Sequence, residues 1–127
     1  MQTYFIFAAI VTVIVGVVHS MFGEILIFKK LRKRGIVPTE SAPPLQARNV
    51  KILWATWHLA SAFGFGIAGI LLSLSNSKLS PDPIVIYPLL FAFIVGSLLV
   101  LFATRGKHPG WVGLLVVAVL IYLGGVA

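Results

Sequence analysis

The sequence contains no cysteine, and only three of its 127 residues are acidic. Without cysteine, the chain has no disulfides, thiolate metal sites or iron–sulfur clusters. Few carboxylates, no serine nucleophile beside a base and no phosphate-cradling glycine loop together argue against hydrolytic and phosphoryl-transfer chemistry. Metal-centred chemistry is the catalytic class that stays open.

Charged residues of either sign are also scarce. They make up 10% of the chain, and 59% of its residues are hydrophobic. About a quarter of the residues are charged in soluble domains. The composition therefore predicts an all-α integral membrane protein, and the length corresponds to one domain.

Four apolar runs account for most of the chain, namely residues 4–28, 50–74, 84–103 and 111–127. A membrane-spanning helix needs roughly 20 apolar residues, with a range of about 17 to 25. Each run is long enough, and the last is the shortest. Because the connections are short, we expect a single transmembrane domain folded as an up-down-up-down bundle of four transmembrane helices.

The basic residues are distributed unevenly among the connections. Seven of the ten lie in or beside the first connection, two lie in the third, and Lys78 lies in the second. The positive-inside rule places the first and third connections in the cytoplasm and both ends of the chain outside. The charge of +7 therefore indicates orientation rather than nucleic acid. The basic run at residues 29–34 also suits anionic lipid headgroups.

A few ionisable residues interrupt the apolar runs: His19 and Glu24 in the first and His58 in the second. A charge at the bilayer centre costs roughly 2.5 to 3.5 kcal/mol on insertion scales. With a rise of about 1.5 Å per residue, both histidines lie at a similar depth in the cytoplasmic leaflet. We expect these groups to meet one another, or a bound guest, away from lipid.

Two interpretations of His19 and His58 are open. Each imidazole forms a hydrogen bond to a neighbouring helix and fixes its register, or the two ligate a transition metal or haem iron. Glycines beside His19 would leave room for a flat macrocycle. Arg48, Arg105 and Lys107 would then lie near the haem propionates.

Glu24 also has two interpretations. It lies about 140° round the helix from His19, at 100° per residue. It could complete a His/Glu metal site with His108. Alternatively, it forms an ion pair with a basic residue at the interface, for which the candidates are Arg48, Lys51 and Arg105.

The remaining polar candidates have simpler explanations. His108 lies in the sequence Arg-Gly-Lys-His-Pro-Gly-Trp, which predicts a surface turn before the fourth helix. Trp54, Trp57 and Trp111 lie near the predicted cytoplasmic interface, where tryptophan anchors helices. We assign none of the three a cofactor role.

Three short motifs contain the polar positions. They are His19-Ser20 followed by Gly23-Glu24, then Trp57-His58, and Gly106-Lys107-His108. With these motifs the chain resembles a group of small bacterial four-helix membrane proteins. The resemblance extends over nearly the whole length and implies a bacterial inner membrane, but it implies no particular activity.

Three functions are compatible with these features. The first is binding of haem or a metal ion by His19 and His58 for redox chemistry. The second is a proton- or cation-coupled transporter or channel that works as a homo-oligomer. In it, Glu24 would exchange a proton or cation, and the histidines would relay protons or sense pH. The third is an accessory subunit of a larger membrane complex, docked through small residues at Ala60, Gly64 and Ala68 and at Gly96 and Ser97.

Overall fold

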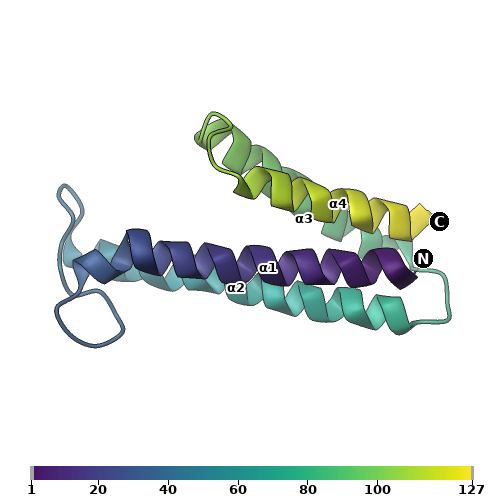
Figure 1. The fold of residues 1–127 in the computed structure, drawn as a ribbon, viewed down its shortest axis with the longest axis horizontal. Helices are drawn as coiled ribbons and strands as arrows, with labels where there is room; N and C mark the ends of the chain where they lie inside the picture. Colours follow the sequence, from purple (N-terminus) through teal and green to yellow (C-terminus); the bar gives the residue numbers. More distant parts are fainter. Residues whose placement is uncertain (1, 127) are drawn as a thin grey trace. The chain divides into compact units, whose positions relative to one another are not determined.

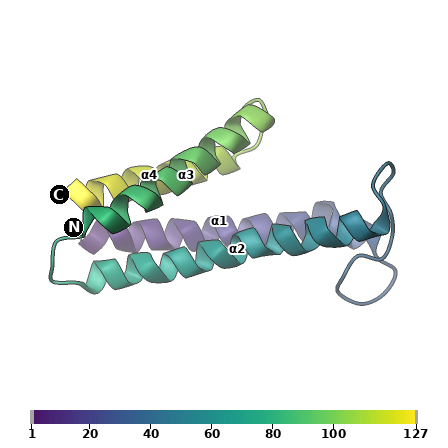
Figure 2. The same ribbon diagram turned by 180° about the vertical axis from the view of Figure 1, so that it is seen from behind.

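The computed structural model describes residues 2–126, and it is helical apart from the connections. Successive long helices run in opposite directions (Figures 1 and 2). The elements are α1 (Gln2–Leu26), the 3₁₀ helix η1 (Phe28–Leu31), α2 (Ala47–Asn76), α3 (Pro83–Ala103) and α4 (Gly110–Val126). The all-helical class with four long helices is therefore confirmed. The predicted last residue of the fourth helix, Ala127, lies outside the described residues.

Three of these helices are long and apolar enough to cross a membrane. They are Thr3–Leu26, Ala47–Asn76 and Pro83–Ala103. The fourth, α4, is equally apolar in character but has 17 residues. This length lies at the lower end of the range of about 17 to 25 residues for a membrane span.

The first two helices differ from their predicted bounds for local reasons. α1 ends at Leu26 instead of residue 28, because Phe28–Leu31 tighten into the 3₁₀ helix η1. α2 begins at Ala47, three residues before the apolar run, since Ala47 and Arg48 have good helix propensity. Pro43 and Pro44 prevent a further extension towards the N-terminus.

Both ends of α3 have clear capping signals. The Asp82 carboxylate accepts a hydrogen bond from the Ile84 amide at 2.9 Å, and Pro83 occupies the first helical position. At the other end, Gly106 has a φ of +74°. Its amide donates to the Leu101 carbonyl at 2.8 Å and closes the helix.

The chain forms two compact units. The first unit combines residues 2–15 with residues 64–126, so it contains parts of α1 and α2 and all of α3 and α4. Small residues at several core positions allow the helices to approach closely. The core side chains are Phe5, Ala8, Ala9, Ala68, Leu71, Ile86, Leu89, Phe93, Val117, Ala118 and Ile121.

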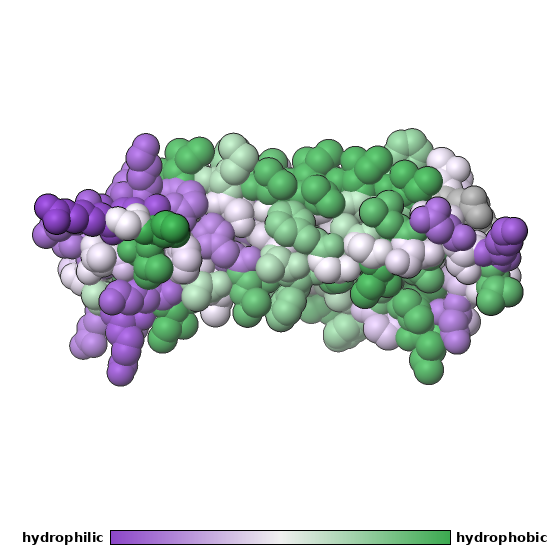
Figure 3. Space-filling model, turned by 90° about the horizontal axis from the view of Figure 1, so that it is seen from below, coloured by the Kyte–Doolittle hydropathy of each residue, from purple (hydrophilic) through white to green (hydrophobic). Residues whose placement is uncertain are grey.

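The second unit, residues 16–63, is a helical hairpin, which we call the hairpin unit. It contains the end of α1, η1, the long connection and the start of α2. Many of its large apolar side chains, such as Phe22 and Phe63, are exposed on the outside. Hydrophilic residues gather at the end of α1 and α2 that carries the connection (Figure 3). Between the two helices lies a set of polar contacts.

Candidate functional site

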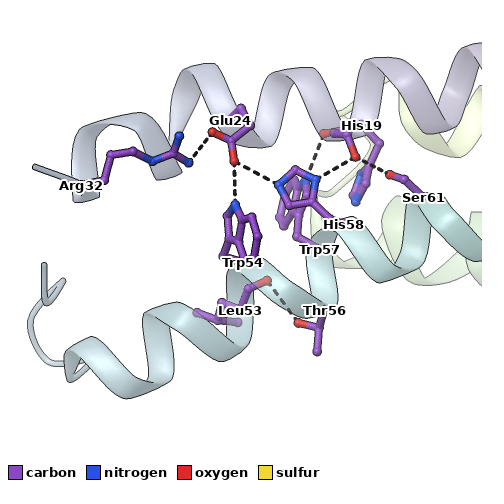
Figure 4. A network of polar contacts seen from close by, with 10 residues as sticks. His19, Glu24, Arg32, Leu53, Trp54, Thr56, Trp57, His58 and Ser61 are labelled. Carbon is purple, nitrogen blue, oxygen red and sulfur yellow. Dashed lines mark hydrogen bonds and ion pairs between the residues drawn. The ribbon is translucent and has the colours of Figure 1, made fainter. Parts of the chain in front are cut away.

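The candidate site lies within the hairpin unit, on the facing surfaces of α1 and α2 (Figure 4). Residues four apart share one face of a helix. On α1 this spacing aligns Ser20 with Glu24, and on α2 it aligns Trp54 with His58. The residues of the site are His19, Ser20, Glu24, Arg32, Trp54, Trp57, His58 and Ser61.

The Glu24 carboxylate is at the centre of the site. Its Oε1 accepts a hydrogen bond from Trp54 Nε1 at 2.7 Å and lies 3.0 Å from Nε2 of His58. Its Oε2 accepts from the Arg32 guanidinium. A half-buried carboxylate is tolerated when its oxygens are satisfied by donors and an opposite charge. Glu24 and His58 thus meet each other, as the sequence argument requires.

His58 continues the network away from Glu24. Its Nδ1 lies 2.9 Å from the Ser20 hydroxyl oxygen, and that hydroxyl donates to Ser61 Oγ at 2.8 Å. Ser61 is only 3% exposed. We call the unbroken series of hydrogen bonds Ser61–Ser20–His58–Glu24 the polar relay.

The positions of the heavy atoms in the polar relay are compatible with two arrangements of the protons. When Ser20 donates to Ser61, its oxygen accepts from His58 Nδ1–H, and a second proton lies between Nε2 and Glu24. In the opposite direction, Ser61 donates to Ser20, Ser20 donates to Nδ1, and Nε2–H donates to Glu24. The two arrangements differ by one proton. The relay can therefore take up a proton at its Ser61 end and return it there without moving a heavy atom far.

Beside the polar relay, Trp57 lies against α1. Its ring stacks on the His19 imidazole, with centroids 4.4 Å apart and planes at 7°. Its Nε1 donates to the His19 carbonyl at 2.9 Å. A Cβ at Gly23 would overlap the Trp57 indole nitrogen, so glycine at this position allows the close approach.

Arg32 reaches Glu24 because η1 turns the chain back after α1. The amides of Thr39 and Glu40 both donate to the Leu31 carbonyl at 2.9 Å, which closes the connection into a loop beside Arg32. The ion pair that the sequence indicated for Glu24 is present, but its partner is Arg32. The prediction of Arg48, Lys51 or Arg105 as the partner was wrong, because the 3₁₀ helix η1 brings Arg32 back towards Glu24.

The other predicted site residues lie elsewhere. Arg48 is exposed near the start of α2. Arg105, Lys107 and His108 belong to the first unit, in the turn between α3 and α4, and are exposed. His108 Nδ1 accepts from the Gly110 amide at 3.0 Å, which is a local turn contact.

The same turn contains Trp111, whose Nε1 donates to the Gly106 carbonyl at 3.2 Å. Among residues 2–126, no group of three or more histidine, aspartate or glutamate side chains is placed to hold a metal ion. The predicted set of His19, His58, Glu24 and His108 is thus not gathered into such a group.

Three residues of the site escaped the sequence analysis. Ser20 and Ser61 are neutral, and serine hydroxyls in apolar helices commonly bond their own backbone, as Ser73 does to Gly69. Arg32 was counted only among the basic residues that indicate orientation and suit anionic lipid headgroups. Ser20 could have been noticed, since it lies one turn before Glu24 on the same helical face.

Comparison of the chain with models of known protein families, with characterised proteins and with solved structures found no match.

Proposed function

We propose that this chain is a multi-pass membrane protein that transfers protons along the polar relay, as a proton channel or a proton-coupled transporter. The observation that carries the proposal is the continuity of the relay. Each of its three contacts joins heavy atoms 2.8 to 3.0 Å apart. Such distances are within the normal range for hydrogen bonds, along which protons can pass.

The proposed setting is a bacterial inner membrane. Three helices have the length and apolarity of membrane spans, and α4 is proposed as the fourth. The basic residues of the first and third connections favour a cytoplasmic position for both, with the two ends of the chain outside. In this orientation the polar relay lies in the cytoplasmic leaflet, with Glu24 nearer the cytoplasm than Ser61.

Transfer along the polar relay begins from the arrangement in which Ser61 donates to Ser20 and Ser20 donates to His58. A proton arriving at Ser61 Oγ allows the Ser61 proton to pass to Ser20, and the Ser20 proton passes to His58 Nδ1. The Nε2 proton of His58 then moves to Glu24, which becomes neutral. Release of that proton from Glu24 towards the cytoplasm leaves His58 with its remaining proton on Nδ1. Turning of the imidazole ring, which brings an N–H back towards Glu24, and reversal of the hydroxyl directions then restore the arrangement in which Ser61 donates to Ser20.

Binding of haem or a metal ion by His19 and His58 stays a prediction with less geometric support. A ligating imidazole uses one nitrogen for the metal and usually donates from the other. Both nitrogens of His58 already have protein partners, Ser20 and Glu24. An absorbance spectrum with elemental analysis of the purified protein would test this alternative directly.

The accessory-subunit hypothesis depends on an exposed face of small residues. Two of the five small residues named for it are buried, since Ala68 is 2% exposed and Ser97 is 3% exposed. A homo-oligomer is compatible with the proton-transfer proposal, because a chain of this size would enclose a pore most simply as several copies.

The test is proton flux into liposomes that contain the purified chain, driven by a membrane potential. Glu24→Gln removes the group that accepts the proton and keeps its shape. We expect flux to fall by about a hundredfold, the scale of a lost acid–base group. Glu40→Gln is the matched control, because the Glu40 carboxylate contacts the exposed Lys33 and the Thr39 hydroxyl and takes no part in the polar relay. Equal flux in the wild type and Glu24→Gln would refute the proposal.

A further inference from the structure

Arg32 closes the Glu24 end of the polar relay. Its guanidinium bonds Oε2, the carboxylate oxygen that the relay does not use. As long as this ion pair persists, the carboxylate is held in its charged form and a proton on Glu24 is opposed by the adjacent positive charge. A change in the position of Arg32 would therefore control proton transfer through Glu24.

The closed position of Arg32 is incompletely satisfied. Its side chain is 19% exposed, yet its Nε–H is a buried donor without a partner in the described part of the chain. A buried donor that lost its water without gaining a partner offsets part of the gain from the ion pair. Arg32 can thus leave Glu24 at a lower cost than a fully bonded guanidinium would.

The residues around Arg32 indicate which alternative partner its guanidinium could bind. Lys29, Lys30 and Arg34 are exposed, and the first of them follows the apolar span Thr3–Leu26 by three residues. Chain continuity therefore keeps this basic segment close to the surface of any membrane that the span crosses. Ile36, two residues after Arg34, is 73% exposed. Basic residues beside an exposed apolar side chain are typical of segments that bind anionic membrane surfaces.

We propose that Arg32 is a latch on the polar relay and that the headgroups of anionic phospholipids release it. This inference rests on the proposed function. The phosphodiester of a headgroup offers the guanidinium two oxygens in the fork geometry that arginine prefers. Arg32 cannot bond Glu24 and a headgroup phosphate at the surface with the same donors. Lipid binding and closure of the relay are then mutually exclusive, and anionic lipid raises proton flux.

The exclusion has a reciprocal consequence. If lipid competes with Glu24 for Arg32, removal of the Glu24 charge must strengthen lipid binding, because the coupling between two sites acts in both directions. Simple attraction between opposite charges makes a different prediction. It requires the loss of any nearby carboxylate, including Glu40, to have the same effect.

The experiment measures binding of phosphatidylglycerol to the intact chain by native mass spectrometry, in the wild type and four variants. We expect Arg32→Gln to weaken binding, and Lys51→Gln, which removes an exposed positive charge on α2, to leave it near the wild-type value. Glu24→Gln should tighten binding at least about fivefold, the lower end of typical coupling between sites. Glu40→Gln should tighten it much less. Equal effects of Glu24→Gln and Glu40→Gln, or of Arg32→Gln and Lys51→Gln, would overturn the latch.

Proton flux in liposomes provides the second arm. With phosphatidylcholine alone we expect low wild-type flux that rises when phosphatidylglycerol is included, and Arg32→Gln should give high flux in both. Flux of Arg32→Gln that stays as low as the wild type in phosphatidylcholine would overturn the latch and leave the polar relay intact. Flux that Glu24→Gln does not reduce would instead overturn the proposed function.

Discussion

At the scale of single residues, the site depends on how one carboxylate is satisfied. Glu24 of α1 has contacts with Trp54 and His58 of α2 and with Arg32, which directly follows η1. The sequence identified Glu24 and His58 as groups that need partners, because ionisable side chains in an apolar run are costly. It did not identify Arg32, because the fold of the connection that returns it has no strong sequence signal.

The hydrogen bond from Trp54 to Glu24 should contribute measurably to the free energy of unfolding. Trp54→Phe keeps the aromatic ring and removes the N–H that lies 2.7 Å from Oε1. A hydrogen bond to a charged group contributes about 2 kcal/mol, so we expect the free energy of unfolding in mixed micelles to fall by that order. Trp111→Phe is the control, since its indole donates to a neutral carbonyl at 3.2 Å. Equal losses in both variants would contradict the role given to the charge of Glu24.

Gly23 tests the packing of Trp57 against α1. Gly23→Ala places a Cβ on the indole ring, and such overpacking typically costs about 1 to 3 kcal/mol. Gly66→Ala is the matched control, because nothing lies within 4 Å of its Cβ position. There, alanine should stabilise the helix by about 0.5 to 1 kcal/mol. Thermal unfolding should thus shift in opposite directions, and a shared direction would show that Trp57 does not need Gly23.

At the scale of elements, α1 and α2 must keep a fixed register for the polar relay to form. Their presence follows from the apolar runs, which have the length and composition of spans. Their register does not follow from those runs. Apolar residues occupy nearly all faces of both helices, so the sequence has little periodic signal that would show which faces pack together. The register is instead specified by a few polar contacts, of which Ser20 to His58 and Trp57 to His19 are examples.

An insertion tests this register. One alanine inserted after Met21 turns Glu24 by about 100° and moves it about 1.5 Å along α1, relative to Ser20. We expect proton flux and thermal stability both to fall, because Glu24 leaves Trp54 and His58. The same insertion after Lys78, in the connection between α2 and α3, should change neither by much. Wild-type flux with the first insertion would contradict the required register.

At the scale of the whole molecule, the central expectation is orientation in the membrane. Composition and run length predicted four long helices, and the structure contains them. The positive-inside rule gives the proposed orientation from charges alone. The polar relay could be foreseen only in part, since Ser20 and Ser61 have no charge and are common in apolar helices.

The absence of cysteine makes the orientation easy to test. Ile36 and Leu79 are 73% and 79% exposed, in the first and second connections. With single variants Ile36→Cys and Leu79→Cys, a membrane-impermeant maleimide added outside intact spheroplasts should label position 79 only. Lysis should expose position 36. Labelling of position 36 from outside would reverse the proposed topology.

The most direct test of the polar relay is proton flux through variants of Ser20, which has no charge and lies between His58 and Ser61. Ser20→Ala breaks the relay, and we expect flux in liposomes to fall by about a hundredfold, the scale of a lost proton-transfer group. Ser20→Thr keeps the hydroxyl and should retain most of the flux. If Ser20→Ala conducts protons as well as the wild type does, the proton does not pass through the relay and the account is wrong.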